Sequence, residues 1–83
     1  MEHEAYPYQV SIWVEPIKGS WLIDKPYWME MCRCITENRA RDIAECVLIR
    51  HRLVQVARLQ GDHFEPIAWY PDKETVQKVI QQP

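Results

Sequence analysis

Three cysteines and three histidines are the side chains of this 83-residue sequence with the widest range of chemistry. Cys32 and Cys34 are separated by one residue, so on a strand both thiols would point to the same side. With Cys46 and either His51 or His63 they could begin a site for a soft metal ion. Structural zinc usually takes cysteine pairs about two to four residues apart and needs four ligands. The spacing therefore favours buried free thiols, and we predict neither a metal nor a cofactor.

Nucleophilic catalysis by a cysteine, with His51 or His63 as the base, is a second possibility. No surrounding motif marks an oxyanion hole, and Cys and His residues occur together by chance in chains of this length. The two glycines, Gly19 and Gly61, are too few for a phosphate-binding loop. We therefore predict that the protein is not an enzyme and has no catalytic residues.

The arginines are confined to the middle of the chain. All six lie between residues 33 and 58 with three acidic residues, all four lysines lie outside this segment, and the whole chain has a formal net charge of -2. Arginine is the cation suited to bidentate contacts with carboxylates and phosphates. The segment could therefore contact a protein partner or nucleic acid. The simpler interpretation is that these arginines are solvated and bridge to neighbouring acids.

Several large or charged side chains have no obvious place in a core and suggest a binding surface. Trp, Tyr, Arg and Met dominate the energetics of protein interfaces, and this chain contains all four. The partner-binding residues that we predict are Trp13, Trp21, Arg41, Leu48 and Arg52. A structural alternative exists for two of them, since Trp21 could cover the core and Leu48 could be one of the isolated apolar residues found on ordinary surfaces.

The first half of the chain predicts two strands. Apolar and polar residues alternate strictly over residues 8–15, which is typical of a strand with one buried face, and Trp13 lies on its outer face. Residues 15–26 contain two prolines and a glycine and predict a loop around Trp21. Residues 28–35 are apolar on both faces, which suggests a central strand covered on one side by the helix and on the other by the loop, the N-terminal arm or a second subunit.

The second half predicts two more strands. Residues 53–59 and 63–70 are joined by a short turn in which Gly61 supplies a positive φ angle. Pro66 lacks the N–H that a strand ladder needs, so the last strand should lie at an edge or contain a bulge.

Two helices complete the pattern. Thr36 is the expected N-cap of the first, and its apolar stripe recurs at helical spacing over Ala40, Ile43, Ala44 and Val47. The second helix starts after Pro71 and Asp72.

These elements predict the fold class and its boundaries. We expect a small single α+β domain in β-β-α-β-β-α order, a mostly antiparallel four-stranded sheet with two helices packed on one face. Residues 1–7 form a flexible N-terminal arm and residues 8–83 the domain.

The first residues lack a secretory signal, and no apolar run approaches the roughly 20 residues that span a bilayer. We expect a cytoplasmic protein without membrane association. The function that the sequence favours is a small regulator or inhibitor that docks on a larger protein, with a homodimer possible. The alternative is a nucleic-acid-binding module that uses the same arginines.

Overall fold

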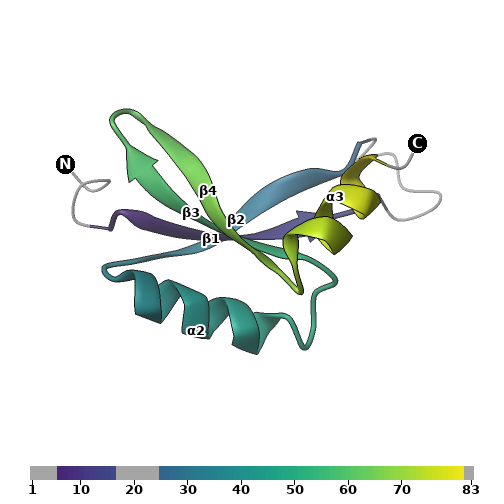
Figure 1. Ribbon diagram of the computed structural model, residues 1–83, viewed down its shortest axis with the longest axis horizontal. Coiled ribbons are helices and arrows are strands. Elements are labelled where there is room, and N and C mark those ends of the chain that lie inside the picture. Colours follow the sequence, from purple (N-terminus) through teal and green to yellow (C-terminus); the bar gives the residue numbers. More distant parts are fainter. Residues whose placement is uncertain (1–5, 17–24, 82–83) are drawn as a thin grey trace.

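The computed structural model describes residues 6–16 and 25–81 and contains four strands and two helices in these ranges. In chain order they are β1 (Tyr8–Val14), β2 (Tyr27–Cys34), α2 (Glu37–Val47), β3 (Val54–Gln60), β4 (His63–Tyr70) and α3 (Lys73–Gln81). The strands form one antiparallel sheet in the order β2-β1-β3-β4 (Figure 1). The predicted α+β fold, with its β-β-α-β-β-α order, is confirmed.

α2 covers one face of the sheet and packs chiefly against β1 and β3 (Figure 1). Ala40 and Ala44 are completely buried at this contact, where their small side chains let the helix lie close to the strands. The core cluster consists of apolar residues from α2 and all four strands: Val10, Ile12, Cys34, Ala40, Ala44, Val54, Val56 and Ala68. Ile43 and Val47 pack against it, so the predicted stripe of α2 is the buried face.

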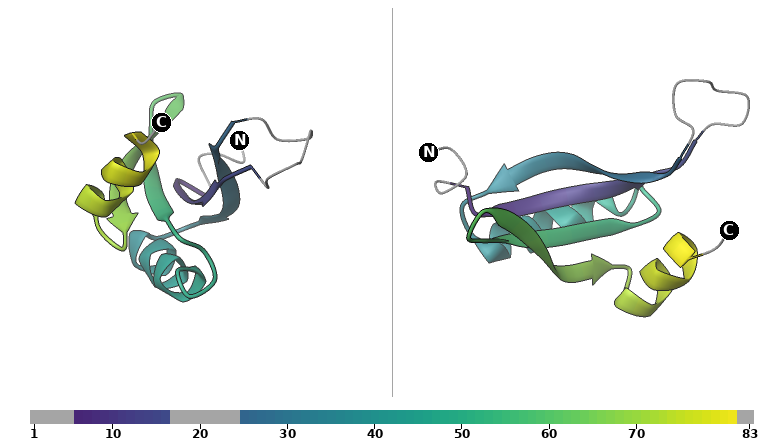
Figure 2. Two further views of the ribbon diagram at one scale, coloured as in Figure 1. Left: turned by 90° about the vertical axis from the view of Figure 1, so that its right-hand side faces the viewer. Right: turned by 90° about the horizontal axis from the view of Figure 1, so that it is seen from above.

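α3 follows β4 closely and packs against that strand. Its first turn is capped by Asp72, whose Oδ1 accepts a hydrogen bond from the backbone N–H of Thr75 at 2.7 Å. We expected both helices on one face, but Figure 2 shows α3 beside the end of β4 and apart from α2. Within the described residues, neither helix is long and apolar enough to cross a membrane.

The strand order corrects one expectation. β2 was expected to be central because both of its faces are apolar. Among the described strands it pairs with β1 alone and lies at an edge of the sheet. The register between these strands shifts beside Val10, where Met31 is an extra residue on β2. Met31 therefore forms a bulge, and its apolar neighbours lie at an exposed edge instead of between two covered faces.

The last hairpin follows the sequence-based expectation. Gly61 adopts a φ of 65° in the turn between β3 and β4. β4 lies at the other edge of the sheet, and its register with β3 shifts next to Pro66, which leaves Ile67 as an extra residue. The predicted edge position and bulge at Pro66 are both confirmed.

Replacing the α2 cap should weaken the domain measurably. Thr36 Oγ1 accepts a hydrogen bond from the backbone N–H of Arg39 at 3.2 Å. Thr36→Ala removes this acceptor and should lower the free energy of unfolding by about 1 kcal/mol in urea denaturation. Thr36→Ser keeps the hydroxyl and is the matched control, which should lose much less. Equal losses in the two variants would show that the hydroxyl is not what stabilises the helix start.

Candidate functional site

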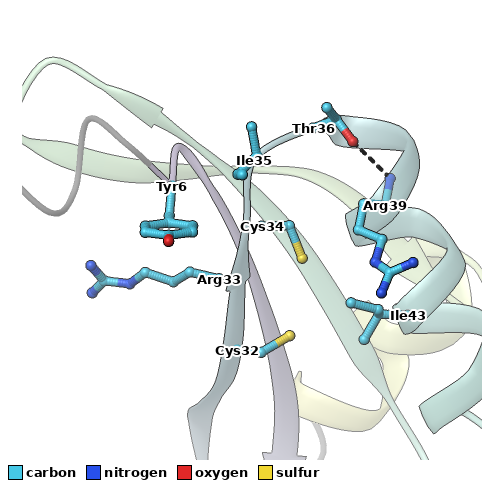
Figure 3. Close-up of a pocket in the computed structure, with 8 residues that line it drawn as sticks. All are labelled: Tyr6, Cys32, Arg33, Cys34, Ile35, Thr36, Arg39 and Ile43. Atoms are coloured by element: carbon cyan, nitrogen blue, oxygen red, sulfur yellow. Dashed lines mark hydrogen bonds between the residues drawn. The ribbon is translucent and has the colours of Figure 1, made fainter.

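A pocket opens where β2 passes into α2. It has a volume of about 410 Å³. The residues that line it come from the segment before β1, from β2 and from the first half of α2: Tyr6, Cys32, Arg33, Cys34, Ile35, Thr36, Arg39 and Ile43 (Figure 3). The pocket therefore combines two thiols, a phenol and two arginines with an apolar wall.

Cys32 and Cys34 lie side by side in this pocket. They pair with Val10 and Tyr8 of β1, and both thiols point toward α2, whereas the Arg33 side chain extends away from the helix (Figure 3). Cys34 is buried and Cys32 is half-buried. Burial, followed by the influence of the neighbouring Cys34 and of Glu30, raises the pKa of Cys32 to about 11. Cys32 is therefore protonated at neutral pH and is a poor nucleophile.

The other residues of the possible metal or catalytic site lie elsewhere. Cys46 is exposed on α2. His63 is exposed near the β3–β4 turn, where its ring nitrogens lie 3.1 Å from Glu65 and 3.3 Å from Asp62. These carboxylates raise the pKa of His63. In the ranges 6–16 and 25–81, no three His, Cys, Asp or Glu residues form a group that could hold a metal ion.

The predicted partner-binding residues do not form one surface. Trp13 packs edge-on against Trp28, with ring centroids 5.2 Å apart, on the sheet face opposite α2. Arg41 belongs to α2, and Leu48 is the C-cap of that helix. Trp21 lies outside the described residues. The described members of the set are therefore divided between two faces of the domain.

Several of these residues already have partners within the chain. Leu48 packs against the core cluster, which gives it a structural role that the sequence analysis did not foresee. Arg41 Nε lies 2.9 Å from Glu37 Oε2, and this hydrogen bond, with a further one to Tyr70, raises the pKa of Arg41. Arg52 Nη1 lies 3.1 Å from Glu15 Oε1. These pairs agree with the interpretation that the arginines bridge to neighbouring acids.

A row of exposed apolar residues along β2 was missed by sequence reasoning. Among the described residues, seven large hydrophobic side chains are exposed. Four of these belong to β2 or directly follow it, and we call them the β2 strip: Tyr27, Met29, Met31 and Ile35. The signal was present, because residues 28–35 are apolar on both faces, but it was assigned to a central strand. Tyr6, also exposed, lies next to Ile35 in the pocket.

The strip is exposed because α2 does not extend beneath it. The first half of β2 rises away from the helix, whereas its last residues lie above the start of α2 (Figure 1). Tyr27 and Met29 pair with Val14 and Ile12 and so share the face that α2 covers further along the sheet. Tyr27 and Met29 are therefore an uncovered continuation of the core-facing surface.

Comparison with known proteins found no matching family model, no similar curated protein and no similar solved structure. The interpretation of the site therefore depends on its own residues.

The two accessible thiols should differ sharply in reactivity. With a pKa of about 11, roughly one Cys32 thiol in a thousand is ionised at pH 8. Iodoacetamide should therefore modify exposed Cys46 first. The rate at Cys32 should rise about tenfold per pH unit up to its pKa, since only the thiolate reacts. Peptide mass spectrometry after timed alkylation measures both rates, and equal rates at pH 8 would contradict the raised pKa.

Proposed function

We propose that this protein is a non-enzymatic docking module, a small regulator or inhibitor, that binds another protein through the β2 strip. The observation that carries the proposal is the concentration of exposed apolar side chains on one edge strand. Within the strip, Tyr27 Oη lies 3.9 Å from Met29 Sδ. Contiguous apolar patches mark interaction sites in soluble domains, whereas isolated apolar residues do not. Tyr and Met, which make up three of the four strip residues, are enriched at protein interfaces.

The energy available from the strip indicates the kind of contact it could make. Its side chains remain 39% to 65% exposed. Burying the rest of these four side chains would contribute on the order of 3–4 kcal/mol before the costs of association. A micromolar complex needs about 8 kcal/mol. The strip would therefore be the centre of an interface, and polar residues around it would have to contribute as well.

Polar groups suited to such a rim lie on the same strand, on the face that points away from α2. Glu30 Oε1 accepts hydrogen bonds from Gln9 Nε2 at 2.8 Å and from Arg33 Nε at 2.6 Å, which holds one carboxylate and one guanidinium beside the apolar residues. Arg39 lines the adjacent pocket. A partner with an apolar ridge flanked by charges of both signs would match this arrangement.

The bulge at Met31 favours docking through side chains over addition of a partner strand. A regular edge strand presents an even row of N–H and C=O groups to which another strand can pair. The extra residue at Met31 interrupts that row in the middle of β2. A second copy of this chain, as in a homodimer, would face the same interruption, so it too would dock through its side chains.

The nucleic-acid alternative has less support. An aromatic pair does exist, because Trp13 and Trp28 lie together on the sheet face opposite α2. The positive charge available for phosphate contacts is reduced, because three of the six arginines are paired with carboxylates. The pairs are Arg33–Glu30, Arg41–Glu37 and Arg52–Glu15. Binding that depends on phosphate contacts would have to break these pairs or use the remaining arginines.

Charge placed on the strip should abolish docking. We expect Met29→Glu combined with Met31→Glu to lose capture of a protein partner from the source-cell lysate in a nuclease-treated pull-down, because the carboxylates cannot be buried against an apolar ridge. Ile49→Glu is the matched control, since Ile49 is 87% exposed and lies beyond α2, away from β2. It should retain the partner.

The same assay distinguishes the other assignments. The variant with Met29→Glu and Met31→Glu should keep its partner only if the interface lies elsewhere. If it does, and a variant with Arg41→Glu and Arg52→Glu loses the partner, the interface lies at the arginines predicted from the sequence. Capture that disappears on nuclease treatment would support the nucleic-acid alternative. Light scattering of the purified chain tests the homodimer, whose mass should fall to that of a monomer in the strip variant. Circular dichroism confirms that each variant is folded.

A further inference from the structure

We propose that Cys32 and Cys34 form a binding site for one soft, two-coordinate metal ion, with Cu(I) as the ion that suits it best. The site is separate from the docking proposal and depends on different side chains. It consists of two thiols on one strand face, at the wall of a pocket that is open to solvent.

The strand geometry places the two thiols on one face but does not favour a disulfide between them. Cys32, Arg33 and Cys34 pair in regular register with β1, so the two thiols lie on the same face. Figure 3 shows both thiols on the side of the strand that faces α2, at the wall of the same pocket. On a strand, the Cα atoms of residues two apart are separated by about 6.6 Å, and their Cα–Cβ bonds are roughly parallel. A disulfide needs Cβ atoms about 3.5–4.5 Å apart, so this pair is better suited to bridging by an ion.

The number and type of ligands point to a soft ion with low coordination. A metal–sulfur bond is about 2.3 Å long, so one ion can join sulfur atoms up to about 4.6 Å apart. Thiolates select Cu(I) over harder cations. Zinc would need about two further protein ligands. Across the described parts of the chain, no group of three or more His, Cys, Asp or Glu residues offers them.

The surroundings of the pair fit the charge of the product. Two thiols bind one Cu⁺, both S–H bonds break, and two protons pass to solvent, which leaves a bis-thiolate complex with a single negative charge. Arg39 lines the same pocket, and the first turn of α2 begins beside it. The guanidinium and the positive end of the helix dipole would oppose the burial and the Glu30 charge, which raise the pKa of Cys32 and disfavour a thiolate.

The direct test is an anaerobic titration of the reduced protein with Cu(I) in competition with a chromogenic Cu(I) chelator. We expect one ion per chain. Cys32→Ser or Cys34→Ser should weaken binding at least 100-fold, because each variant removes one of the two ligands. Cys46→Ser is the matched control and should bind as the unaltered chain does. A stoichiometry other than one, binding unchanged in Cys32→Ser, or binding lost in Cys46→Ser would overturn the proposal.

A second measurement avoids substitution in the core, since Cys34 is buried. The unaltered protein is alkylated at high pH with and without one equivalent of Cu(I), and labelled peptides are quantified by mass spectrometry. We expect Cu(I) to protect Cys32 at least tenfold and to leave Cys46 fully reactive. Equal labelling of Cys32 with and without Cu(I) would overturn the proposal even if both serine variants fail to fold.

Discussion

The packing of one short helix on a wider sheet is the constraint on which the rest of this structure depends. α2 has 11 residues, which makes it about 16 Å long and about 10 Å wide. Strands lie about 4.8 Å apart, so such a helix covers about two of four strands. Ala40 and Ala44 hold α2 over β1 and β3. The first residues of β2 then lie outside the part of the sheet that α2 covers.

The position of β2 follows from this constraint. Its last residues lie at the start of α2, so Cys34 belongs to the core, whereas Tyr27 at the other end of the strand is exposed. Cys32 lies between these environments and is half-buried. Over its eight residues, β2 thus runs from an exposed tyrosine to a buried cysteine. The pocket and the β2 strip are two results of the same partial coverage.

The fold separates the charged side chains from the aromatic rings. Arg41 is held on α2 by Glu37, and Arg52 reaches Glu15 at the end of β1. Trp13 packs against Trp28 on the opposite side of the sheet. Surface ion pairs of this kind contribute little to stability, about 0–1 kcal/mol each, but they reduce the charge that a ligand would meet. The domain therefore presents an apolar edge more clearly than a positive face.

Local physical chemistry was enough to predict the elements of this fold. The alternation in β1, the Thr36 cap, the positive φ at Gly61 and the break at Pro66 each depend on residues close together in sequence. The shared face of Cys32 and Cys34 is predictable for the same reason, because it follows from the period of a strand.

Only the tertiary structure decided which apolar surfaces are covered. A strand that is apolar on both faces can be central or can expose one face at an edge, and the sequence of β2 is compatible with both. The choice depends on which strands lie beside it and on where α2 packs, and these contacts join residues far apart in the chain. Leu48 is a similar case. It packs against a core cluster that includes strand residues far from it in sequence, so its neighbours in sequence did not reveal this role. The sequence by itself determined the elements and their faces, and long-range packing determined which of those faces remained available.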